Sequence, residues 1–174
     1  MSKEKTRSIG GVAMKGVVVY DSYYGNTKKV AEAIAEQIRS EGHEVDLRTL
    51  RERYDKQVQG DFIFVGSPTR MGKMTRRAKV FVKKMDKGSW KEKPVVTFDT
   101  IMPMPEDEKE REKARKWIEN GAAPKLSALA KNMGLATYSP PLRIEVTGMK
   151  GPLSEGALEK AKDYTKEFLR SLGR

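Results

Sequence analysis

The stretch that decides the fold is Val19-Tyr20-Asp21-Ser22-Tyr23-Tyr24-Gly25-Asn26-Thr27-Lys28-Lys29-Val30-Ala31. It opens on the end of a short β-branched run, residues 16–21, which is bounded by turn signals and predicts a buried strand. Beyond the loop, Val30, Ile34 and Ile38 recur every four residues and predict one apolar helix face, ending at Gly42. The stretch therefore predicts a strand, a tight polar loop and a helix in direct succession.

The loop in this stretch has the chemistry of a phosphate cradle. Gly25 can adopt a backbone conformation that other residues avoid. Ser22 and Thr27 offer hydroxyls, and Asn26 offers an amide. The free N–H groups and the dipole of the following helix favour an anion in the same space. An ordinary polar helix cap is the alternative interpretation, because Ser, Asn and Thr are common cap residues.

The same alternation continues along the chain. Further strands are predicted at residues 44–48, 61–66, 94–98 and 138–146, the first of them near a sheet edge because its residues alternate in polarity. Helices are predicted around residues 78–85, 114–133 and 158–172. The second of these should bury Trp117 and break between Asn120 and Pro124, and the third should have Ser154 as its N-cap.

Strands that alternate with helices predict βαβ units with right-handed crossovers. We expect an α/β protein, a three-layer α/β/α sandwich around a five-stranded parallel sheet. Residues 1–14 are polar and predict a flexible N-terminal tail. Residues 15–174 predict one domain.

The composition narrows the function. The 174 residues include no cysteine, which excludes disulfides, thiolate metal sites and cysteine nucleophiles. The single histidine, His43, lies in a polar stretch and is interpreted as a solvated turn residue. No apolar run is long enough to span a membrane and no secretory signal is visible, so a cytoplasmic location is expected.

The formal net charge of +11 and the pI of about 9.7 suit nucleic acid, anionic lipid or acidic protein partners. A Lys/Glu-rich, thermophile-like surface is the alternative reading. No RNA-binding motif with interleaved aromatic residues appears, which makes nucleic acid an unlikely partner.

Other phosphate-binding loops do not fit. The chain has neither the GxxxxGK[ST] motif of P-loop hydrolases nor a GxGxxG motif after the first strand. A phospho-acceptor receiver domain would need clustered acids at the end of the first strand, where only Asp21 stands.

The quoted stretch resembles the flavodoxin signature, in which a strand runs into a Ser/Thr-x-x-Gly-Asn-Thr loop that holds the phosphate of flavin mononucleotide (FMN). The element order agrees with that family over roughly residues 15–172, and the resemblance implies a flavodoxin-like sheet with the strand order 2-1-3-4-5. The resemblance implies FMN as the cofactor, and it implies phosphate-loop contacts from Ser22, Tyr23, Tyr24, Gly25, Asn26 and Thr27.

A second loop, Gly66-Ser67-Pro68-Thr69-Arg70-Met71-Gly72-Lys73-Met74, looks like the flavin-ring loop of the family, and especially like that of NAD(P)H:quinone oxidoreductases. Pro68 fixes one dihedral and Gly72 frees another. The implied cofactor contacts are Pro68, Thr69, Arg70, Met71 and Gly72, with Arg70 as a positive charge near the ring or, equally, a plain surface cation.

A third loop begins at Asp99 and Thr100, and the resemblance places it beside the flavin ring. Electron-carrier flavodoxins usually stack an aromatic residue there, whereas this loop offers Met102 and Met104, which also contact aromatic rings favourably. A second departure is the charge: such carriers are typically acidic, and here Lys73, Arg76, Arg77, Lys79, Lys83 and Lys84 follow the second loop.

The sequence thus predicts an FMN-binding redox flavoprotein. Either it transfers electrons to or from a partner protein, for which the basic charge favours an acidic one, or it acts as an oxidoreductase that reduces a quinone or similar acceptor with NAD(P)H. An oligomer is possible through Met71 and Met74. A non-redox module that binds nucleic acid or an acidic protein through the basic surface is the alternative.

Overall fold

We analysed a computed structural model of the protein, which describes residues 12–52 and 58–173. Most of the predicted tail, residues 1–11, lies outside this part. Five parallel strands form one sheet of order β2-β1-β3-β4-β5, as the sequence predicts. The strands are β1 (Lys15–Tyr20), β2 (Glu44–Thr49), β3 (Phe62–Pro68), β4 (Val95–Ile101) and β5 (Leu142–Glu145).

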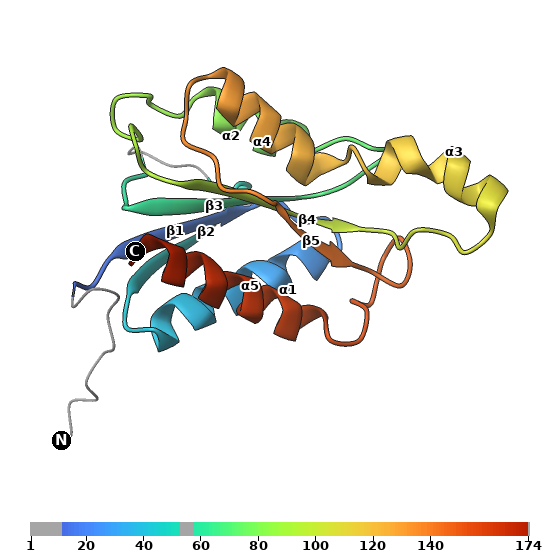
Figure 1. Cartoon of the computed structure of the whole chain (residues 1–174), viewed down its shortest axis with the longest axis horizontal. Helices are drawn as coiled ribbons and strands as arrows, with labels where there is room; N and C mark the ends of the chain where they lie inside the picture. Colours follow the sequence, from blue (N-terminus) through green and yellow to red (C-terminus); the bar gives the residue numbers. More distant parts are fainter. Residues whose placement is uncertain (1–11, 53–57, 174) are drawn as a thin grey trace.

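Helices cover both faces of this sheet and make three layers (Figure 1). The helices are α1 (Asn26–Ser40), α2 (Arg76–Lys83), α3 (Glu108–Ile118), α4 (Ala122–Asn132) and α5 (Ala157–Leu172). α1 and α5 lie on one face, whereas α2 and α4 lie on the other. Both faces are apolar because parallel strands are covered on both sides, so the protein has two core clusters, one on each face of the sheet.

The core on the α1 and α5 face is built around aromatic rings. Phe168 of α5 packs edge-to-face against Phe62 and Phe64 of β3, with ring centroids 5.3 and 5.2 Å apart. Residue Gly66 of β3 has no room for a side chain, because an added Cβ would lie 2.1 Å from the ring of Phe98. Side-chain packing therefore holds the central strands in register at the end of the sheet where the loops lie.

α3 differs from the other helices, since it extends beyond the sheet (Figure 1) and contains no buried residue. The predicted break between Asn120 and Pro124 is confirmed, because α4 begins at Ala122. The prediction that Trp117 is buried is wrong, since the residue is 40% exposed. The apolar spacing in this helix does not face the sheet, because α3 continues past the sheet's end.

Two further sequence predictions are wrong. The N-cap of α5 is Gly156, in a left-handed conformation, and not Ser154. His43 is buried and not solvated; its Nδ1 accepts the backbone N–H of Met14 at 2.9 Å. Burial lowers the pKa of His43. The polar neighbours that suggested a solvated turn connect α1 to an edge strand, where the backbone N–H of Met14, the residue before β1, reaches the imidazole.

Within the described ranges, no helix combines the length and the apolar composition that a membrane-spanning segment requires.

Candidate functional site

A cleft of about 340 Å³ opens at the carboxyl ends of the strands. This is where an open parallel sheet places its ligand site, because the loops after neighbouring strands diverge there. Four loops contribute, those after β1, β3, β4 and β5. The lining residues are Ser22, Tyr23, Tyr24, Asn26, Thr27, Pro68, Thr69, Arg70, Met71, Thr100, Met102, Val146 and Met149.

The β1–α1 loop forms the polar end of the cleft. Gly25 is the N-cap of α1 at φ 91°, and no side chain caps the helix. The Ser22 Oγ instead accepts the N–H of Gly25 at 3.1 Å, which closes the turn. The first turn of α1 therefore keeps unpaired N–H groups, and it contains no acidic residue. This end of the cleft has the properties of an anion site.

Thr27 connects this loop to β4, which is separated from β1 in the sheet by β3. The hydroxyls of Thr27 and Thr100 lie 2.9 Å apart in a buried hydrogen bond. Asn26 is also buried, and its side chain lies against Gly151, where an added Cβ would lie 2.6 Å from it. Two polar side chains at the start of α1 are thus fixed by segments more than 70 residues away in the chain.

The β3–α2 loop forms a tight bend beside the cleft. Arg70 and Lys73 exchange backbone hydrogen bonds, and Met71 and Gly72 between them have φ values of 49° and 76°. Lys125 Nζ donates to the carbonyl of Gly72 at 2.6 Å. Met71 is 78% exposed at the tip of the bend. Gly72 itself does not line the cleft but makes the bend possible, because a left-handed backbone favours glycine.

Two guanidinium groups lie against the ring of Tyr23. The Cζ atom of Arg70 is 4.1 Å and that of Arg51 is 4.8 Å from its centroid. Arg51 is also hydrogen-bonded through Nε to the buried Asp21, at 3.1 Å. Arg70 therefore lies on the cleft wall, and stacking on Tyr23 holds it there.

Asp99, expected to contact the cofactor, does not line the cleft. Its buried carboxylate forms an ion pair with Arg143, whose Nη2 lies 2.9 Å from Oδ2. The same oxygen accepts the Thr69 hydroxyl at 2.8 Å and the Ala123 N–H at 3.0 Å. Asp99 thus points toward α4 and orients Thr69, a cleft residue. Gly25 is likewise outside the lining set, although it shapes the loop.

The remaining ten predicted site residues all lie in the one cleft. A family model described as a flavodoxin domain matches residues 17–140, which is more than half of the chain. The chain belongs to the flavodoxin family.

The chain is also similar to a flavodoxin in sequence and to a solved flavodoxin in structure. The chain is 46% identical over 69 residues to the flavodoxin of Aquifex aeolicus (strain VF5), a match that covers 38% of this chain and 37% of that relative's length. A solved flavodoxin from the domain Archaea superposes with a TM-score of 0.70 at 24% identity, over 92% of this chain and 100% of that one.

The fold also occurs within longer proteins. The rubredoxin oxygen:oxidoreductase of Desulfovibrio gigas superposes with a TM-score of 0.65 at 20% identity, over 97% of this chain and 37% of that one. At these identities the structural likeness concerns the fold alone.

Sequence reasoning missed the contribution of the β5–α5 loop to the cleft of this flavodoxin-family protein. Val146 and Met149 line the wall, and Lys150 Nζ lies 5.7 Å from the Tyr24 ring centroid. Arg51 was also missed. The available signal was the strand order, since all parallel strands end at the same edge of the sheet. The loop's own composition gives no such indication.

Proposed function

We propose that this flavodoxin-family chain binds FMN in the cleft and acts as a redox protein. The uncapped N-terminus of α1, which opens into the cleft, is the observation that carries the proposal. A phosphate dianion would accept hydrogen bonds from the free N–H groups of the first turn and would interact favourably with the helix dipole. The side chains of Ser22, Asn26 and Thr27 line the same end, so further donors are at hand.

The apolar part of the cleft lining suits a flat aromatic ring. Tyr23, Tyr24, Met71, Met102 and Met149 line it, and all five are exposed in this structure. Exposed apolar side chains that gather at one cleft indicate a ligand or partner site. Thioether groups contact aromatic rings favourably, so Met102 and Met149 would substitute for the missing ring-stacking aromatic residue.

The flavin supplies the electron-transfer chemistry when bound. The chain's own residues bind the phosphate, cover the ring and set the charge around it. Arg70 lies on the cleft wall and would favour negative charge on a reduced ring. Electron exchange with a partner protein is the function that this arrangement and the family support together. Reduction of a quinone with NAD(P)H remains a finer hypothesis, for which Arg70 is the supporting residue.

The test is a visible absorption spectrum of the purified protein, before and after FMN is added and the sample is desalted. We expect flavin bands that survive desalting. A protein that binds no FMN in excess would contradict the proposal and would favour a binding module without a redox role. Oxidation of NADPH by the FMN-loaded protein, with a quinone present, then separates a reductase from a carrier.

Asn26→Ala combined with Thr27→Val tests the phosphate end. We expect the dissociation constant for FMN to rise at least tenfold, since each hydrogen bond to a charged group contributes roughly 1.5–3 kcal/mol. Thr165→Val is the matched control, because Thr165 is also a buried helical threonine whose hydroxyl is hydrogen-bonded, to the carbonyl of Ala161, away from the cleft. Unchanged FMN affinity in the folded double variant would contradict the assignment.

A further inference from the structure

The positive charge of this protein is concentrated in one segment. Residues 70–93 contain ten basic and two acidic side chains, so they account for eight of the eleven formal charges in excess. We call the basic residues of this segment the α2 patch: Arg70, Lys73, Arg76, Arg77, Lys79, Lys83, Lys84, Lys87, Lys91 and Lys93. All except Lys93 are exposed. The rest of the chain is close to neutral.

None of the α2 patch residues forms an ion pair with a carboxylate in the described part of the chain. α3 is the opposite case. It mixes both signs, and Lys113 and Arg115 form ion pairs with Glu110, Glu112 and Glu119. The charge on α3 is therefore largely neutralised within the helix. The α2 patch retains its field, which extends about 8–10 Å into solvent at physiological salt.

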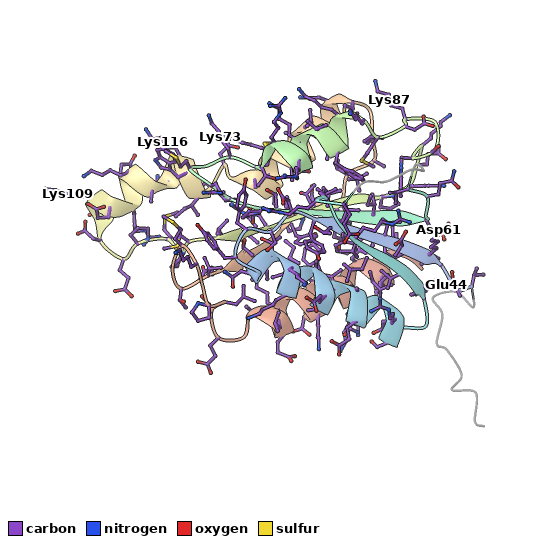
Figure 2. The ribbon with its side chains drawn as sticks, turned by 180° about the vertical axis from the view of Figure 1, so that it is seen from behind. Glu44, Asp61, Lys73, Lys87, Lys109 and Lys116 are labelled. Carbon is purple, nitrogen blue, oxygen red and sulfur yellow. The ribbon has the colours of Figure 1, made fainter. Side chains whose placement is uncertain are left out.

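The α2 patch begins at the cleft. Arg70 lines the cleft, and Lys73 follows one tight bend later. Figure 2 shows Lys73 and Lys87 along the outer edge of the α2 layer, one near each end of the helix, with Lys87 toward the same end of the molecule as Glu44 and Asp61. The α2 patch therefore runs from the cleft along the α2 layer toward the opposite end of the sheet.

Apolar side chains adjoin the α2 patch at the same place. Met71 lies between Arg70 and Lys73 and is 78% exposed, and Met149 across the cleft is 76% exposed. Protein interfaces combine such an apolar centre with a charged rim. A surface for single-stranded nucleic acid would instead use exposed aromatic residues for base stacking, and the aromatic residues of this segment, Phe81 and Trp90, are half-buried and buried.

We infer that the α2 patch is the docking surface for an acidic protein, seated with its apolar contact on Met71 at the cleft mouth. The inference rests on the proposed redox function, because the cleft is where electrons would leave. Electrostatic complementarity of this kind increases the association rate and fixes the orientation of the partner. The partner would carry acidic side chains around its own redox centre.

The experiment compares two triple variants of the FMN-loaded protein. Lys79, Lys83 and Lys84 are each replaced by Gln on α2, and Lys109, Lys113 and Lys116 by Gln on α3, so both variants lose the same charge from exposed positions. The probe is an acidic plant-type [2Fe–2S] ferredoxin, with binding measured by titration calorimetry at low and at physiological salt. We expect the α2 variant to lose affinity about tenfold and the α3 variant less than twofold.

Equal losses in the two variants would overturn the inference, because net charge alone would then explain the binding. No loss in either variant would overturn it too. A DNA duplex that binds more tightly than the ferredoxin, and is released by the α2 changes, would replace the acidic protein with nucleic acid. The titration is repeated without FMN, so a protein that binds the probe but no FMN contradicts the proposed function and not the docking surface.

Discussion

Two aspartates at the carboxyl end of the sheet are equally buried and differently paired. Asp21 follows β1 and Asp99 lies in β4, and both have no exposed surface. Asp99 accepts hydrogen bonds from Arg143, Thr69 and Ala123. Asp21 accepts one from Arg51, whose side chain is 42% exposed, and its Oδ2 has no partner among the described residues.

The two carboxylates therefore differ in their roles: Asp99 is part of the framework of the site, whereas Asp21 lies at its border. Asp99 joins β4 to β5, α4 and the β3–α2 loop, and so fixes Thr69 in the cleft wall. Asp21 holds a single surface arginine against Tyr23. Burial alone therefore does not indicate importance, because the free energy depends on how completely the charge is paired.

The largest effect is expected for Asp99→Asn. It leaves the Arg143 guanidinium without its anion in a mostly buried position, which costs about 3–5 kcal/mol. Urea unfolding of the FMN-free protein measures it, with Asp61→Asn as the control, since Asp61 accepts the Lys15 N–H at an exposed position. Adding Arg143→Met should recover part of the loss by removing the unpaired charge. A loss below about 1 kcal/mol for Asp99→Asn would mean that the two aspartates do not differ.

A smaller effect is expected for Asp21→Asn. Neutralising Asp21 removes an unpaired buried anionic oxygen, and Arg51 can remain solvated, so the free energy of unfolding should change by about 1 kcal/mol or less. The same urea experiment measures it. A loss as large as that of Asp99→Asn would show that Oδ2 has a partner outside the described residues.

The smallest effect concerns His43, whose Nε2 is the other buried side-chain atom without a partner in the described part. Burial lowers the pKa of His43 from its ordinary value of 6.5, so the folded protein binds fewer protons here than the unfolded chain. The contribution to stability is complete above that value and is lost as the pH falls through it toward the lower folded pKa.

The pH dependence of His43 is measured by urea unfolding of the wild type and of His43→Gln at several pH values. We expect the wild type to lose more stability than the variant between neutral and mildly acidic pH. Identical pH dependence in both proteins would contradict the assigned shift.

The β1–α1 loop was predictable from sequence because its geometry is local. Ser22, Gly25 and Thr27 follow a β-branched strand directly, and the turn and helix start depend on neighbours in the chain. The element order was predictable for a related reason, since hydrophobic periodicity marks the strands and helices and the handedness of crossovers restricts the topology. The strand order 2-1-3-4-5 followed from the resemblance to the flavodoxin family.

The pairing of buried polar groups was not predictable in this way. Asp99 and Arg143 are 44 residues apart, and the hydrogen bond between Thr27 and Thr100 spans 73. His43 lies in a polar stretch, yet it is buried and accepts a hydrogen bond from Met14, 29 residues away. In each case the partner is brought close by the sheet, and the free energy comes from excluding water around both groups.

The sequence by itself determined the alternation of strands and helices, the tight polar loop between β1 and α1, and the excess of positive charge. Only the tertiary structure decided that Asp99 holds Thr69 in the cleft wall without itself lining the cleft. It also decided that Met149 lines the cleft from a fourth loop. It also placed Arg70, the first residue of the α2 patch, on the cleft wall. Local conformation follows from neighbouring residues, whereas burial and charge pairing depend on which distant segments the fold brings together.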